Sequence, residues 1–308
     1  MFDRSSMMAA VSALALALTA CGGAGGGVAS TPPPPPTPAP PPPPPPTPAI
    51  PPIPDQPIGL AVNGSFAVFS SHYEAGQTTA TKNGLQFAYS AATDEYTISI
   101  PGYQPGQLVP TGGSGSVGDD GTWLDLVSTA NDVTNSDGKL SVTLAWPAHL
   151  GFKYTSIGSW GSVDGERGNF VYGVPTLAGD MPVTGSADYS GIIQGLTSDQ
   201  YDVFGGISLS FNFGAGTLTG AMTPEIAPIW DTVGLGTYTF RDTVYSTGST
   251  SFSGAFDSPG SNAPSSFQGE FTGPSGSELM GSWQAPYLDP VSGSWGSMSG
   301  VFIGAKEP

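Results

Sequence analysis

Alternation of apolar and polar residues recurs through the C-terminal part of the chain, and it limits the fold more than any other feature. In the segment 205–213, four apolar side chains occupy one face and three polar ones the other: Ile207, Leu209, Phe211 and Phe213 against Ser208, Ser210 and Asn212. A period of two residues is that of a β-strand with one buried face. Such patterns predict strands at about 184–195, 205–213, 215–223, 237–245, 250–257, 266–272, 277–285 and 298–305.

Short turn sequences join these eight segments. Examples are Gly214-Ala215-Gly216 and Asp257-Ser258-Pro259-Gly260, which carry the residues that favour tight turns. An even number of short, successive antiparallel strands fits an up-and-down barrel, which leaves no free strand edge. We therefore predict an all-β protein with a C-terminal eight-stranded antiparallel barrel, built from residues beginning near 160.

Two glycine-aromatic motifs indicate which way the apolar faces point. Phe252-x-Gly254-x-Phe256 and Phe267-x-Gly269-x-Phe271 each place a glycine between two rings on one face. Glycine permits sharp strand curvature while the rings fill a narrow interior. Eight strands would also suffice for a barrel embedded in a membrane, but central glycines would make a poor lipid-facing band. The motifs favour a barrel filled with apolar side chains.

The N-terminus reads as a bacterial lipoprotein signal. An apolar run of about a dozen residues, too short to span a bilayer, ends in Leu18-Thr19-Ala20-Cys21, and Cys21 is the only cysteine. We expect cleavage before Cys21 and lipidation of its thiol; the alternative is an ordinary secretory signal with an incidental cysteine. Because Gly22 and not aspartate follows the cysteine, we expect the protein to be lipid-anchored in the outer membrane, with the folded part at the cell surface.

Composition divides the rest of the chain. Residues 21–55 contain a glycine stretch and a tract with more than half of the 32 prolines, which predicts a polyproline spacer of roughly 70 Å. Residues 56–150 are predicted to form a smaller β-rich domain, and residues 151–308 to form the barrel domain. With no second cysteine, the stability of both must come from packing and strand pairing.

Charge and motifs exclude several classes of function. The chain has 24 Asp and Glu against 7 Lys and Arg, whereas nucleic acids and anionic lipids bind clustered positive charge. No Gly-x-Ser-x-Gly motif is present, and Asn135-Ser136-Asp137-Gly138 reads as a hairpin turn more readily than as a calcium loop. His72 and His149 are far apart in sequence. We therefore predict no enzyme activity, no cofactor and no metal site, with surface or packed roles for the histidines.

Two groups of apolar residues are candidates for binding. Met222 to Trp230 is apolar and contains Pro224 and Pro228, so we expect a loop that leaves the strand. Its candidate contact residues are Met222, Ile226, Ile229 and Trp230; the alternative is a loop folded back onto the core. Aromatic residues in the first half could form a binding platform or simply pack in the core: Tyr103, Trp123, Trp146, Tyr154 and Trp160.

Several segments together resemble a known family. Residues 172–176 and 180–191 are similar to the start of the barrel in transferrin-binding protein B-like surface lipoproteins, and residues 267–274, 278–283 and 300–306 look like its closing strands. Thr272 stands where that family usually has tyrosine, and Met280 precedes Gly281. The resemblance covers about residues 150–308, and residues 58–149 are similar only in general character to the family's β-rich handle.

The resemblance implies a fold and a class of function. It implies a non-enzymatic outer-membrane lipoprotein that binds a protein, an iron-bearing ligand or haem through its loops. Because such loops diverge freely, no binding residue is carried over. A structural or adhesive envelope lipoprotein without a small ligand is the alternative.

Overall fold

The computed structural model describes residues 64–90, 95–103, 106–108, 123–127, 141–145, 150–228 and 231–308. The chain divides into two compact units, Met1–Thr47 and Pro48–Pro308, and all described residues belong to the second. The predictions for Cys21, the proline tract, His149, Ile229 and Trp230 lie outside the described residues.

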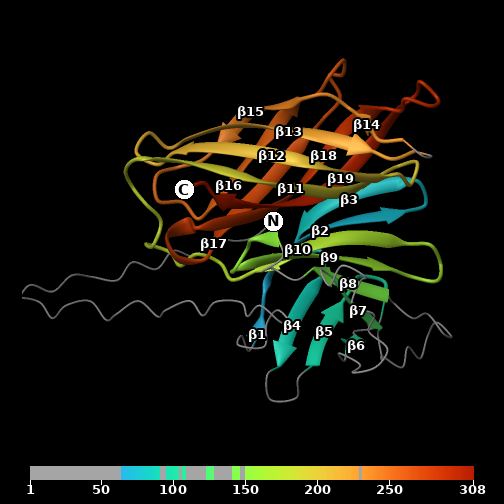
Figure 1. Ribbon diagram of the computed structural model, residues 1–308, viewed down its shortest axis with the longest axis horizontal. Helices are drawn as coiled ribbons and strands as arrows, with labels where there is room; N and C mark the ends of the chain where they lie inside the picture. Colours follow the sequence, from blue (N-terminus) through green and yellow to red (C-terminus); the bar gives the residue numbers. More distant parts are fainter. Residues whose placement is uncertain are drawn as a thin grey trace, which may run out of the picture. The chain divides into compact units, whose positions relative to one another are not determined.

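The C-terminal part is a closed antiparallel barrel of eight strands, drawn in yellow to red in Figure 1. Its strands are β11 (Ser186–Thr197), β12 (Asp202–Asn212), β13 (Thr217–Ile226), β15 (Tyr238–Val244), β16 (Ser251–Asp257), β17 (Ser266–Thr272), β18 (Glu278–Leu288) and β19 (Trp295–Lys306). β11 pairs with β19, and β12 pairs with both β11 and β13, which closes the barrel. A short strand, β14 (Val233–Gly234), pairs with the end of β13, and a 3-10 turn, η1 (Pro274–Gly276), precedes β18. The predicted all-β fold with an eight-stranded barrel is confirmed.

The two glycine-aromatic motifs face the barrel interior, as predicted. Their four phenylalanines are buried, and the register sets Phe252 opposite Gly269 and Phe267 opposite Gly254. A methyl group on Gly254 would lie 2.6 Å from Cζ of Phe267, and one on Gly269 would lie 2.4 Å from Cζ of Phe252. Each ring therefore covers the glycine of the neighbouring strand, which explains why glycine stands at the middle of an apolar face.

Two further sheets precede the barrel, and we call them the handle. A six-stranded sheet has the order β3-β2-β10-β9-β8-β7, and a four-stranded sheet has the order β1-β4-β5-β6. The strands are β1 (Gly64–Ser65), β2 (Ala67–Glu74), β3 (Gln77–Lys82), β4 (Gln86–Ser90), β5 (Glu95–Ser99), β6 (Gly106–Leu108), β7 (Trp123–Val127), β8 (Ser141–Ala145), β9 (Thr155–Gly161) and β10 (Arg167–Gly173). Among the described residues, no helix is long and apolar enough to cross a membrane.

The barrel begins later than expected. β9 and β10 pair with each other and with β8 and β2 of the handle sheet, so the residues from about 160 to 173 belong to that sheet, and the first barrel strand, β11, matches the strand predicted at about 184–195. The reason is that β10 is buried along nearly its whole length, which an alternating pattern cannot reveal. The division of the chain into domains at residue 150 stays a prediction.

Barrel and handle share a second core outside the barrel wall. Met280 and Ile303 are paired across β18 and β19 and point out of the barrel, where they pack with Phe69, Ile157 and Val171 of the handle. Lys82 of β3 also donates to Glu270 of β17 at 2.6 Å. Because apolar contacts and polar bonds both cross this junction, the handle supports the barrel on one side.

The carboxylate of Glu278 is buried at the same junction. It accepts hydrogen bonds from the backbone N–H groups of Lys153 at 2.7 Å and Tyr154 at 3.0 Å. Burial raises the pKa of Glu278, and these hydrogen bonds only partly oppose the rise. The folded protein therefore holds this proton more tightly than the unfolded chain does.

This raised pKa predicts a pH dependence of stability. Glu278 begins to ionise in the unfolded chain at lower pH than in the fold, so its contribution to the free energy of unfolding falls as pH rises through the raised pKa. Relative to Glu278→Gln, the wild-type chain is expected to lose stability from the acidic range towards neutral pH, measured by urea unfolding. A wild-type chain that instead gains stability over the variant with rising pH would show that the fold prefers the carboxylate.

Candidate functional site

Four connections lie at the same end of the barrel, and we call this the loop end. Their described residues are 198–201 between β11 and β12, 227–228 and 231–237 between β13 and β15, 258–265 between β16 and β17, and 289–294 between β18 and β19. Antiparallel pairing brings them together; for example, Ser198 donates its backbone N–H to Ser297 at 2.7 Å. A methyl group on Gly236 would lie 3.2 Å from Pro259, and one on Gly260 would lie 3.7 Å from Trp295. Three of the connections are therefore neighbours in space.

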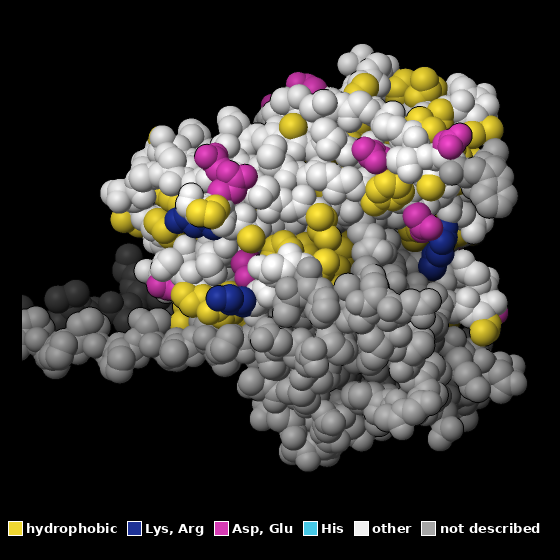
Figure 2. Space-filling model, in the orientation of Figure 1, with side chains coloured by type: hydrophobic (Ala, Val, Ile, Leu, Met, Phe, Trp, Pro, Cys, Tyr) yellow, Lys and Arg dark blue, Asp and Glu magenta, His cyan; other side chains and the backbone are white. Residues whose placement is uncertain are grey.

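The β18–β19 hairpin exposes large apolar side chains at the loop end. Leu288, Val291 and Trp295 are 47%, 57% and 50% exposed, and Leu288 is paired with Trp295 across the hairpin. Figure 2 shows hydrophobic side chains at the upper right, over the loops of this end in Figure 1. A cluster of exposed large apolar residues on one hairpin is a feature of interaction surfaces.

The tip of this hairpin is held by its own side chains. The carboxylate of Asp289 accepts hydrogen bonds from the N–H groups of Val291 at 3.0 Å and Ser292 at 3.1 Å, and from the Ser292 hydroxyl at 2.5 Å. Burial opposes ionisation, but the bonds from Ser292 and Val291 outweigh it and lower the pKa of Asp289. Gly293 supplies the positive φ of +70° that the turn needs. The apolar side chains are thus presented on a preformed turn.

Two of the contact residues predicted from sequence, Met222 and Ile226, do not lie at the exposed surface of the loop end. Met222 and Ile226 belong to β13, have no exposed surface and pack in the barrel core. They therefore lie in a barrel strand instead of the expected loop, and in this structure their side chains offer no exposed surface to a partner. β13 continues through Pro224, at the point where its partner changes from β15 to β14; a proline is tolerated at such an irregularity. The contact role of Ile229 and Trp230 stays a prediction.

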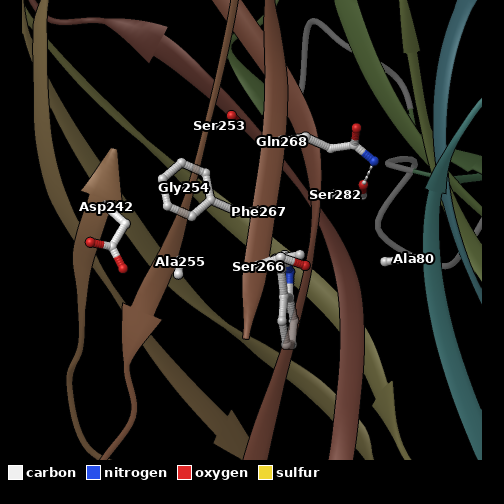
Figure 3. A pocket seen from close by; sticks show the side chains of 10 residues that line it. Ala80, Asp242, Ser253, Gly254, Ala255, Ser266, Phe267, Gln268 and Ser282 are labelled. Atoms are coloured by element: carbon white, nitrogen blue, oxygen red, sulfur yellow. Dashed lines mark hydrogen bonds between the residues drawn. The ribbon is translucent and has the colours of Figure 1, made fainter. Parts of the chain in front are cut away.

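A hollow lies on the flank of the barrel, between β16, β17 and β18 and the handle strand β3 (Figure 3). Its volume is about 520 Å³, and Asp242 lies at one side with Ala80 of β3 at the other. Gln268 donates to Ser282 at 3.4 Å inside it. An adjoining hollow of about 340 Å³ shares Ser253 and Gln268. Serines contribute to the lining of both hollows, beside aromatic residues such as Phe267 and Tyr245.

A polar cluster in the handle contains His72. Its Nε2 atom lies 3.6 Å from Oε2 of Glu166, which also accepts a hydrogen bond from Tyr103 at 2.8 Å. The ring of Trp160 lies 5.3 Å from that of His72 and is buried in the handle core. Burial, followed by the effect of Glu166, raises the pKa of Tyr103.

This cluster ties elements of the handle together and does not form a platform. Trp160 packs in the core, which was the alternative predicted for the aromatic residues. Within the described ranges, no group of three or more His, Cys, Asp or Glu side chains could hold a metal ion. Sequence reasoning missed the apolar side chains of the β18–β19 hairpin. The available signal was Trp295, a large apolar residue within a stretch of glycine and serine.

No family model matches the chain, and no curated protein matches it. Among solved structures it is similar to a double mutant of transferrin binding protein B from Haemophilus parasuis Hp5, with a TM-score of 0.46 and 14% identity over 78% of this chain and 45% of that one. It is also similar to the isotype 1 transferrin binding protein B of serogroup B Neisseria meningitidis, with a TM-score of 0.43 and 13% identity over 78% of this chain and 44% of that one. A third similar structure is HpuA from Kingella denitrificans in complex with human haemoglobin, with a TM-score of 0.40 and 18% identity over 80% of this chain and 88% of that one.

The chain spans less than half the length of the two transferrin binding proteins. At these identities and scores the likeness assigns no residue, ligand or partner, and the architecture described above rests on the strand pairing of this chain itself.

Proposed function

We propose that the chain is a non-enzymatic binding protein, anchored to the outer membrane through lipidated Cys21, that captures a protein partner at the loop end. The observation that carries this proposal is the set of exposed side chains Leu288, Val291 and Trp295 on a preformed hairpin. Binding residues concentrate on loops that a rigid scaffold positions. The barrel is such a scaffold, because aromatic rings fill its interior.

Trp295 is the expected anchor of the interface. A few aromatic side chains near the centre of an interface usually supply most of the binding free energy, surrounded by contacts that exclude water. Trp295 is half exposed and is flanked by Leu288 and by the turn at Gly260. It can therefore lose its remaining exposed surface to a partner without a rearrangement of the hairpin.

Replacing Trp295 together with Leu288 is expected to abolish capture of the partner without unfolding the protein. In the double variant Leu288→Ser and Trp295→Ser, partner binding should weaken by at least about tenfold, while the melting temperature stays close to that of the wild type. Binding is measured with the soluble Cys21→Ser chain against host fluids and spent medium, with the retained proteins quantified by mass spectrometry. The variant Ile229→Ser and Trp230→Ser tests the residues predicted from sequence in the same assay.

A matched control uses the opposite end of the barrel. Val183 and Val244 are 58% and 64% exposed there, so Val183→Ser with Val244→Ser removes a similar amount of exposed apolar surface. Capture should survive this change. If the control loses the partner and the loop-end variant retains it, the contact surface lies at the other end.

The lipid anchor at Cys21 is tested in a separate experiment. Cys21→Ser is expected to abolish labelling by an alkyne fatty acid and to release the protein from the membrane fraction, because a mature lipoprotein is held by several acyl chains. Labelling of the variant equal to that of the wild type would contradict lipidation at Cys21.

Two more specific predictions concern the identity of the ligand and the side of the membrane that the folded part faces. By resemblance, the partner is an iron-bearing protein, or the ligand is haem, and the folded part faces the cell exterior. Two measurements test this: the folded part is expected to be accessible to protease in intact cells, and expression is expected to rise on iron limitation. A protein inaccessible to protease and indifferent to iron would favour the structural envelope lipoprotein instead.

A further inference from the structure

The loop end lacks positive charge. None of its four connections contains lysine or arginine, whereas Asp199 and Asp231 are exposed within them. Two more acids, Glu225 and Asp257, lie at the ends of the strands that enter these connections. At the opposite end of the barrel the chain has Lys306 at the end of β19 and Lys153 beside the start of β18.

The nearest cations are already paired. Arg167 of the handle lies 3.3 Å from Asp202 and donates to the carbonyl oxygen of Gln200. Arg241 lies 2.7 Å from Asp242 and 3.2 Å from Asp257. These pairs use the guanidinium groups within the fold, and in the part of the chain that the structure describes neither Asp199 nor Asp231 forms an ion pair.

The carboxylates and the apolar side chains share one surface. Asp199 accepts a hydrogen bond from Tyr287, which directly precedes Leu288, and Ser198 beside it bonds to Ser297, two residues after Trp295. The screening length at physiological salt is about 8 Å, so a partner that covers the hairpin in contact with Asp199 experiences the charge of its carboxylate. An anionic partner covering Trp295 would desolvate these carboxylates against like charge, at considerable cost.

We infer that the partner of the loop end presents a large apolar side chain surrounded by lysine or arginine, that is, a cationic protein surface. This inference rests on the proposed function. Opposite charge at the rim would raise the rate of association and set the register, while Trp295 and Leu288 supply the buried contact.

A selection from a display library of short random peptides tests the inference on the soluble Cys21→Ser chain. Enriched peptides are expected to carry net positive charge together with a tryptophan, phenylalanine or leucine. Their dissociation constants should rise about tenfold in Asp199→Asn with Asp231→Asn, and their binding should be lost in Leu288→Ser with Trp295→Ser. Asparagine retains an acceptor for Tyr287, and the melting temperature of each variant verifies the fold.

A charge-matched control separates local from overall charge. Glu74→Gln with Asp164→Asn neutralises two exposed acids of the handle and should leave the affinity unchanged. Equal weakening in this control would assign the effect to the net charge of −17 and overturn the inference.

Different results would overturn the cationic partner and the loop end as the binding surface. Neutral or acidic peptides that still require Leu288 and Trp295 would overturn the cationic partner and leave the loop end as the binding surface. Peptides indifferent to Leu288 and Trp295, or the absence of any peptide that depends on them, would count against both.

Discussion

Phe271→Asp is expected to unfold the barrel. Phe271 has no exposed surface, and its ring centroid lies 4.8 Å from that of Phe211, 5.5 Å from Phe252 and 5.7 Å from Tyr189. An aspartate there would bury a charge without a partner and leave a void among the rings, at a cost of several kcal/mol against a typical total stability of about 5–15 kcal/mol. Near-ultraviolet circular dichroism and thermal melting measure the loss.

The control lies on the same strand with the opposite orientation. Ser266 is exposed on β17, so Ser266→Asp should leave the melting temperature nearly unchanged. A cooperative melt of Phe271→Asp at the wild-type temperature would mean that this face of β17 does not point into the barrel.

Gly269→Val is expected to give the second largest loss of stability. A methyl group at this position would lie 2.4 Å from Cζ of Phe252 and 2.8 Å from the carbonyl oxygen of Met280. The ring could move only by displacing its neighbours, and the carbonyl belongs to the paired strand β18. Such overpacking typically costs about 1–3 kcal/mol, which corresponds to a fall in melting temperature of roughly 2–12 °C for a folded unit of this size.

Gly234→Val is the matched change in an open position. No heavy atom lies within 4 Å of a side-chain carbon built on Gly234, so this variant should melt like the wild type. If Gly269→Val were as stable as Gly234→Val, Phe252 would not cover Gly269.

Much of the barrel could be predicted because several of its strands, such as β12, alternate between a face in the core and a face in solvent. The alternation of Phe267, Gly269 and Phe271 with polar residues records that arrangement directly. The strand through Pro224 was missed, since proline usually ends pairing and the change of partner from β15 to β14 depends on tertiary structure. β10 is not among the predicted strands: Phe170, Val171 and Tyr172 form a continuous apolar run, which lacks the alternation of a half-buried strand and does not say which sheet buries it.

The binding surface was harder to predict than the fold. Apolar character in Met222 and Ile226 reflects burial in the barrel, whereas apolar character in Leu288 and Trp295 accompanies exposure. In the sequence, both pairs are simply large apolar residues, so sequence alone does not distinguish the buried pair from the exposed one. What distinguishes them is position: the first pair lies within a strand facing the interior, and the second flanks a turn held by Asp289.

Hydrogen–deuterium exchange of the soluble chain, alone and with its captured partner, tests the central claim most directly. Amide protection on binding reports which segments become covered. The account predicts added protection in residues 258–265 and 286–296, and no change at the opposite end in residues 245–250 and 273–277. Protection confined to the flank hollow at Ser253 and Gln268, or to the opposite end, would contradict capture by the loop end.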